Sequence, residues 1–163
     1  MKNKLDFIMA GGAVQRFHTM RTIHPQNVAE HSFGVAWLVY LLTGGKPSAA
    51  LLLAALGHDL AEHVTGDLPA PAKRALGLGP QFAAAEDAAA SAAGLLLPPL
   101  TDDEAKVLKL ADTLELVLYC QRELAMGNSR MREIALRGIE YAHELRPLTP
   151  NQELIFHIAK EGV

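Results

Sequence analysis

The order of apolar and polar residues along the chain is typical of α-helices. Alanine and leucine recur at helical spacing, and no window alternates apolar and polar residues as a half-buried strand does. We therefore expect an all-α fold, a helical bundle of six to eight helices. The predicted helices cover residues 4–17, 27–42, 49–63, 71–76, 81–97, 101–126, 128–145 and 150–160.

Capping and breaker residues set the expected boundaries of these helices. Asn27 with Glu30, and Thr101 with Glu104, match the capping-box pattern that begins a helix. Breaker residues predict helix ends at Gly44-Gly45 and Pro147, and a weakened or kinked first helix at Gly11-Gly12.

Composition limits the classes of protein that fit this pattern. The chain has 163 residues, of which 50% are hydrophobic and 20% charged, so a single domain over residues 1–163 is expected. The formal net charge of −3 gives no basic excess for holding a nucleic-acid polymer or an anionic membrane. The longest apolar run, residues 49–57, is far shorter than the roughly 20 residues of a membrane span. With one cysteine, Cys120, and no credible signal sequence, we expect a cytoplasmic protein.

Side chains that could bind a metal ion lie on three of the predicted helices. His31, the dipeptide His58-Asp59 and Asp112 are each embedded in apolar sequence. A buried carboxylate without a partner costs several kcal/mol, and a divalent cation would be a partner for all four side chains. Imidazole and carboxylate together suit Zn, Mn, Fe, Co or Ni better than Ca. Each residue alone is more often structural, but this order on successive helices favours a metal site.

The longer motifs around these residues carry a family resemblance. The chain resembles the HD-domain metal-dependent phosphohydrolases, and within them the YfbR-like 5′-deoxynucleotidase family. The matching segments span about residues 15–128, and the bare His-Asp dipeptide would be far less specific. They are Arg16-Phe17, NVAEHS at 27–32, HDLAE at 58–62, TGDLP at 65–69, LAD at 110–112 and ELAMGN at 123–128.

The resemblance implies a role for each matching residue. The implied metal ligands are His31, His58, Asp59 and Asp112. Glu62 would be the catalytic acid that manages a proton, and a continuous helix would place it on the same face as His58 and Asp59. Arg16 would bind phosphate oxygens. The remaining implied substrate contacts are Phe17 on the base, Asp67 on the sugar 3′-hydroxyl, Thr65 and Pro69 in the pocket wall, and Lys73 as a second cation near the phosphate.

The reaction implied by the resemblance is hydrolysis of the 5′-phosphate ester of a 2′-deoxynucleotide. Compact relatives resemble dATP triphosphohydrolases, and the short connections of this chain favour that interpretation over a 5′-deoxynucleotidase for monophosphates. A non-catalytic nucleotide-binding or scaffold protein with an HD-like metal site is the alternative from another class. A phosphodiesterase would need further metal ligands, which the sequence does not offer.

The same resemblance implies one divalent transition metal per site and a small-molecule substrate. Zn, Co or Mn would fit the ligand set, with Mg a further candidate on the substrate phosphates. The high hydrophobic content also favours a homo-oligomer, a dimer or larger. No nucleic-acid polymer and no membrane are expected as partners.

Overall fold

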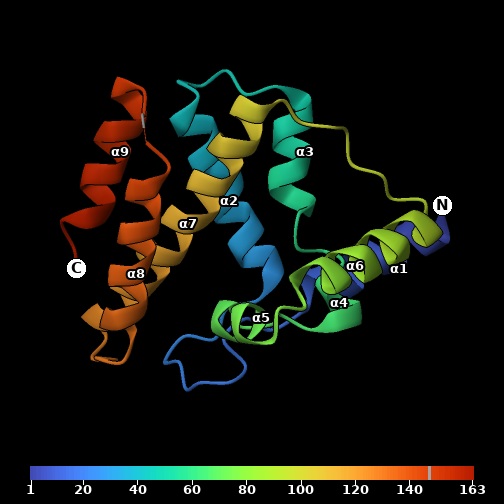
Figure 1. The fold of residues 1–163 in the computed structure, drawn as a ribbon, viewed down its shortest axis with the longest axis horizontal. Helices are drawn as coiled ribbons and strands as arrows, with labels where there is room; N and C mark the ends of the chain where they lie inside the picture. Colours follow the sequence, from blue (N-terminus) through green and yellow to red (C-terminus); the bar gives the residue numbers. More distant parts are fainter. Residues whose placement is uncertain (147) are drawn as a thin grey trace. The chain divides into compact units, whose positions relative to one another are not determined.

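The computed structural model describes residues 1–146 and 148–163, apart from the side chains of residues 70, 71 and 74. The predicted end of a helix at Pro147 lies outside the described residues. Within them the fold is all-α, as expected, and no strand forms beyond a single antiparallel bridge between Gln15 and Asn27. The helices in chain order (Figure 1) are α1 (Lys2–Gly12), α2 (Val28–Leu42), α3 (Ala49–Gly57), α4 (Glu62–Thr65), α5 (Ala70–Leu76), α6 (Gly79–Ala93), α7 (Asp102–Ala125), α8 (Met131–Glu144) and α9 (Pro150–Lys160).

The helices fall into two compact units. The first unit holds residues 1–32 and 57–97, and the second holds residues 33–56 and 98–163. Over the described ranges, seven helices have nine or more residues, which agrees with the predicted six to eight, while α4 and α5 are shorter. The expectation of one domain over residues 1–163 stays a prediction.

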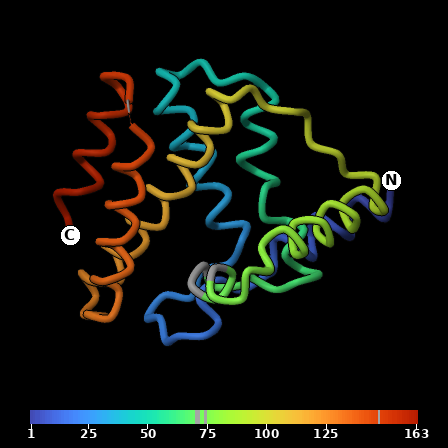
Figure 2. Tube along the Cα trace, viewed as in Figure 1, coloured from blue at the N-terminus to red at the C-terminus, as the bar shows by residue number. Residues whose placement is uncertain are grey.

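The second unit is built on α7. Helices α8 and α9 lie beside α7 (Figures 1 and 2). A Cβ added at Gly138 of α8 would lie only 2.8 Å from Val117 Cγ2 of α7, so this glycine permits the close packing. Residues of α2, α3, α7, α8 and α9 form one apolar core: Val35, Leu38, Val39, Leu42, Leu51, Ala55, Leu110, Ala111, Leu114, Val117, Ala142, Phe156 and Ala159.

Helix α2 also carries apolar side chains on its outer side within the second unit. Phe33, Trp37 and Tyr40 follow one another at helical spacing and are 64%, 55% and 42% exposed. Their rings pack edge to face, with centroids 6.5 Å apart in the first pair and 5.7 Å apart in the second. We call these three residues the aromatic ridge. A soluble helix that is apolar on every side is usually buried, so these exposed rings are unusual.

In the first unit, α1 runs along α6 and meets the segment after α3 (Figure 1). A Cβ at Gly11 would lie 2.3 Å from the carbonyl oxygen of Leu60, so only glycine permits this contact. The prediction of a kinked helix reaching residue 17 was wrong, because α1 ends at Gly12. Beyond it the chain enters the bridge, where Arg16 N–H donates to Gln26 O at 2.9 Å and Val28 N–H donates to Val14 O at 2.9 Å.

Capping residues act as the sequence predicts. Glu30 N–H donates to Asn27 Oδ1 at 2.9 Å, and Asn27 N–H donates to Glu30 Oε2 at 3.2 Å, which makes a capping box at the start of α2. Thr101 and Glu104 form the second predicted box at the start of α7. Among the helices of the described residues, none has the length and apolar character needed to cross a membrane.

Candidate functional site

Three segments of the first unit supply the candidate site. His31 lies near the start of α2 and is fully buried. His58 and Asp59 lie between α3 and α4, where the predicted continuous helix over residues 49–63 was wrong. The chain instead makes short turns there, with Leu60 N–H donating to Gly57 O and Glu62 N–H donating to Asp59 O. The third segment is the bridge region that carries Arg16.

The carboxylate of Asp59 is the meeting point of these segments. Its Oδ1 lies 3.4 Å from His58 Nε2, and its Oδ2 lies 3.6 Å from His31 Nε2. One ring nitrogen of His31 lies within 4.8 Å of one ring nitrogen of His58, and the centroids of the two rings are 5.4 Å apart. Two imidazoles and a carboxylate, gathered in a mostly buried place, are a donor set that suits a divalent transition metal. These three residues therefore fit the predicted metal.

Arg16 places a positive charge directly beside this group. Its Nη1 donates to Asp59 Oδ2 at 3.0 Å, and its side chain is only 11% exposed. Arg16 Nε is buried and has no hydrogen-bond partner in the part of the chain that the structure describes. A buried guanidinium with donor capacity to spare is suited to bind an anion such as phosphate.

Glu62 begins α4 and is 6% exposed. Its Oε1 lies 3.4 Å from Lys73 Nζ, whereas its Oε2 is buried without a hydrogen-bond partner among residues 1–146 and 148–163. Burial, reinforced by the negative charges of Asp59 and Asp67, raises the pKa of Glu62 from 4.5 to about 8, and Lys73 and Arg16 oppose the shift. A carboxyl group that keeps its proton at neutral pH can act as a general acid.

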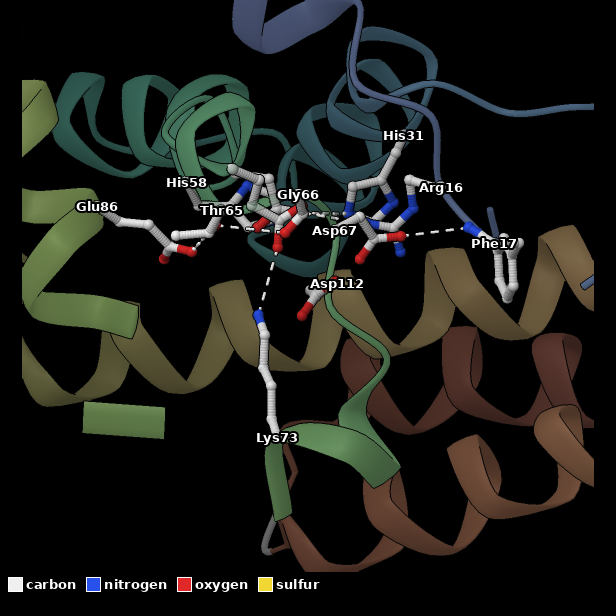
Figure 3. A network of polar contacts seen from close by, with 12 residues as sticks. Arg16, Phe17, His31, His58, Thr65, Gly66, Asp67, Lys73, Glu86 and Asp112 are labelled. Atoms are coloured by element: carbon white, nitrogen blue, oxygen red, sulfur yellow. Dashed lines mark hydrogen bonds and ion pairs between the residues drawn. The ribbon is translucent and has the colours of Figure 1, made fainter. Parts of the chain in front are cut away.

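Two loop contacts lie beside these groups (Figure 3). Asp67 Oδ2 accepts a hydrogen bond of 3.2 Å from the backbone N–H of Phe17. Thr65 Oγ1 donates to Glu86 Oε1 of α6 at 2.6 Å. Sequence analysis missed Glu86, because a glutamate in an alanine-rich helix has the pattern of a solvated residue and no motif marks it.

Two other predicted site residues lie at the start of α5. The carbonyl oxygen of Pro69 accepts from the N–H groups of Ala72 and Lys73, so it begins the helix. Lys73 extends from that helix to Glu62, and its role as a second cation near the phosphate stays a prediction. The pocket-wall role of Pro69 stays a prediction.

Asp112 belongs to α7 in the second unit. Its side chain is 23% exposed, and its Oδ2 accepts from Lys109 Nζ at 3.0 Å. Its role as a metal ligand stays a prediction from the sequence.

His63 is the histidine next to Glu62 that the resemblance leaves outside the ligand set. Its ring packs edge to face on Phe7, with ring centroids 4.5 Å apart, and its Nδ1 lies 2.9 Å from the carbonyl oxygen of Leu60.

Comparison with known proteins places these residues in a family. The model of the 5′-deoxynucleotidase YfbR-like family matches residues 7–99. The 5′-deoxynucleotidase YfbR of Salmonella typhi is 31% identical over 169 residues, covering 90% of this chain and 83% of its own. The Escherichia coli K12 protein with the same name is 32% identical over 139 residues, covering 71% of this chain and 70% of its own.

Solved structures support the same fold. A Pyrococcus horikoshii protein superposes with a TM-score of 0.73 over the full length of both chains, at 23% identity. The cyanophage S-2L HD phosphohydrolase, solved with dA and one catalytic Zn²⁺ ion, has a TM-score of 0.67 at 22% identity, covering 96% of this chain and 93% of its own. At these identities the likeness concerns the fold alone.

Proposed function

Because this chain belongs to the YfbR-like 5′-deoxynucleotidase family of HD-domain phosphohydrolases and is a hydrolase, we propose that it cleaves the phosphate ester of 2′-deoxynucleoside 5′-monophosphates. The products are the deoxynucleoside and inorganic phosphate. The observation that carries the proposal is the Asp59 carboxylate, flanked by two imidazoles and the Arg16 guanidinium, with the buried Glu62 nearby.

The choice of monophosphate differs from the preference drawn from sequence. The short connections of the chain favoured dATP, but the curated relatives are 5′-deoxynucleotidases, and they support the monophosphate alternative better. The non-catalytic scaffold alternative does not fit a chain whose relatives are hydrolases. The triphosphohydrolase activity is therefore treated as an outcome of the test below.

We propose that His31, His58 and Asp59 hold a divalent metal ion, with Asp112 as the fourth ligand predicted from sequence. When bound, such an ion would supply Lewis-acid chemistry: it would polarise phosphoryl oxygens and lower the pKa of a water molecule, so that a nucleophile is available near neutral pH. Zn, Co and Mn all suit this donor set, and Mg²⁺ is a candidate on the substrate phosphate.

The side chains of the site divide the remaining work. In hydrolysis the oxygen of water joins phosphorus, the bond from phosphorus to O5′ breaks, and O5′ leaves with a proton. Arg16 binds the phosphoryl oxygens, where negative charge is concentrated. Glu62, whose burial favours the protonated form, donates that proton to O5′, and the proton that the attacking water releases restores the Glu62 carboxyl group. Lys73 adds a second positive charge beside Glu62.

The deoxynucleoside part of the substrate would contact the remaining predicted residues. Phe17 packs on the base and Asp67 accepts from the 3′-hydroxyl, while Thr65 and Pro69 line the pocket. The proposed partner is thus a small-molecule deoxynucleotide. We also propose that the protein forms a homo-oligomer, because the exposed aromatic ridge offers an apolar surface on α2.

A product assay tests the proposed function. Metal-loaded protein is incubated with dAMP, dATP and AMP, and the products are separated by chromatography. We expect deoxyadenosine and phosphate from dAMP, with AMP hydrolysed more slowly. Deoxyadenosine and intact triphosphate from dATP, with dAMP untouched, would instead establish a triphosphohydrolase. An absence of hydrolysis, with metal confirmed as bound, would contradict both activities.

A further inference from the structure

Phe17 has a strained backbone beside the candidate site. Its φ of +55° makes it the one non-glycine residue with positive φ in the part of the chain that the structure describes. This left-handed conformation is unfavourable for a bulky side chain, so surrounding contacts have to hold it. Strain of this kind is concentrated at functional sites.

Two hydrogen bonds hold the peptide groups of Phe17. Its N–H donates to Asp67 Oδ2 at 3.2 Å, and its carbonyl oxygen accepts from Met20 N–H at 3.0 Å. The preceding residue is already fixed, because Arg16 N–H donates to Gln26 O at the base of the loop. Phe17 is therefore the residue at which the loop leaves the bridge, and Asp67 is the side chain that fixes its N–H direction (Figure 3).

Asp67 is itself held close to the Glu62 turn. It follows Gly66, which has a φ of +77° and whose N–H donates to the carbonyl oxygen of Glu62. Thr65 is tied to Glu86 of α6. A rotation of the Asp67 side chain away from Phe17 would thus remove the hydrogen bond that fixes the Phe17 peptide, and the ion pair of Arg16 with Asp59 would remain as a side-chain contact of the Arg16-Phe17 segment with residues 57–67.

We propose that Asp67 is a positioning residue: its carboxylate holds Phe17 in the left-handed conformation and thereby places Arg16 and Phe17 for the reaction. This inference rests on the proposed function. It assigns Asp67 a partner on the protein, in addition to the sugar 3′-hydroxyl that the family resemblance implies. The two roles are separable, because only one of them needs a hydroxyl group on the substrate.

Kinetics with two substrates separate these roles. Asp67→Ala is compared with the wild type on dAMP and on 2′,3′-dideoxy-AMP, which lacks the 3′-hydroxyl. We expect Asp67→Ala to lower kcat by about tenfold or more on both substrates, because misplacing a binding group by about 1 Å costs up to about a hundredfold. Loss of the contact with the 3′-hydroxyl would add a further decrease on dAMP alone. Asp67→Asn keeps an oxygen that accepts from Phe17 N–H, so it should retain activity within about threefold of the wild type.

A readout without substrate tests the same contact. Arg21 lies on the exposed loop between Phe17 and Gln26, and Arg130 lies exposed in the second unit as an internal control. We expect trypsin to cut after Arg21 several times faster in Asp67→Ala than in the wild type, with cutting after Arg130 unchanged. Fragments are identified by mass spectrometry at a temperature where both proteins are folded.

The outcomes decide the proposal in each case. A kinetic loss confined to dAMP, an Asp67→Asn variant as impaired as Asp67→Ala, or unchanged cutting after Arg21 would each overturn the positioning role. If the wild type hydrolyses neither substrate, the proposed function fails while proteolysis still decides this inference. Faster cutting after Arg21 then supports it, and unchanged cutting overturns it.

Discussion

The contact between α1 and the metal-ligand turn can be tested by adding a single methyl group. In Gly11→Ala the new Cβ would lie 2.3 Å from Leu60 O and 2.7 Å from Leu60 Cα. Ordinary contacts between carbon atoms are about 3.5–4.0 Å, so α1 and the turn would have to separate by roughly 1 Å. Both obstructing atoms belong to the backbone, and no side-chain rotation relieves the clash.

The expected cost follows from these distances. Overpacking costs about 1–3 kcal/mol, and the upper end applies to a backbone clash. The higher helix propensity of alanine offsets at most about 1 kcal/mol of this cost. We therefore expect Gly11→Ala to lower the free energy of unfolding by about 2 kcal/mol, and Tm by about 4–8 °C for a chain of this length. Because Leu60 follows Asp59 directly, we also expect kcat to fall about tenfold.

Gly12→Ala is the matched control for this prediction. Its Cβ would meet only the Cβ of Ala29, at 3.3 Å, so we expect Tm and kcat close to those of the wild type. Thermal unfolding and urea titration of the three proteins measure the difference. If Gly11→Ala is as stable as Gly12→Ala, the close approach of α1 to Leu60 does not exist in solution, and the reasoning is refuted.

Further substitutions test the ligands, the acid and the oligomer. His58→Ala should remove bound metal, measured by elemental analysis, whereas His63→Ala should keep it. Glu62→Gln should keep the metal but lower kcat about a hundredfold or more, and a near-normal rate would exclude the acid role. In metal-free protein, the pKa of Glu62 is raised to about 8, so the folded state favours the protonated carboxyl group. The stability that this protonated group contributes is therefore complete below pH 4.5 and is lost as the pH rises to about 8. The urea midpoint should fall over that window, and it should fall less in Glu62→Gln. Trp37→Glu should shift sedimentation toward the monomer, and an unchanged coefficient would exclude the aromatic ridge as the interface.

Local sequence signals predicted the helices whose ends depend on local chemistry. The boxes at Asn27 and Thr101 were predictable, because capping depends on residues within one turn. The end of α1 at Gly12 and the break after Gly57 were not, because the apolar spacing continues across both. At Gly11 the deciding contact is with Leu60, far away in sequence.

The candidate site was predictable to the extent that its chemistry lies in motifs. Arg16 and Asp59 were both identified by resemblance, and the structure adds that they form an ion pair. The bond from Phe17 N–H to Asp67 could not be predicted, because it depends on a backbone conformation that phenylalanine rarely adopts. Glu86 was missed for a different reason, since it acts on Thr65 through the fold alone.

The interleaving of the two units along the chain has a consequence for synthesis on the ribosome. The first unit is complete only once residue 97 has emerged, and by then residues 33–56 of the second unit have also left the exit tunnel. Their apolar side chains, such as Val35, Leu38 and Leu51, can pack into the core only after α7 to α9 have been translated. During that interval the nascent chain exposes hydrophobic side chains, and we expect chaperones that bind exposed hydrophobic segments to associate with it.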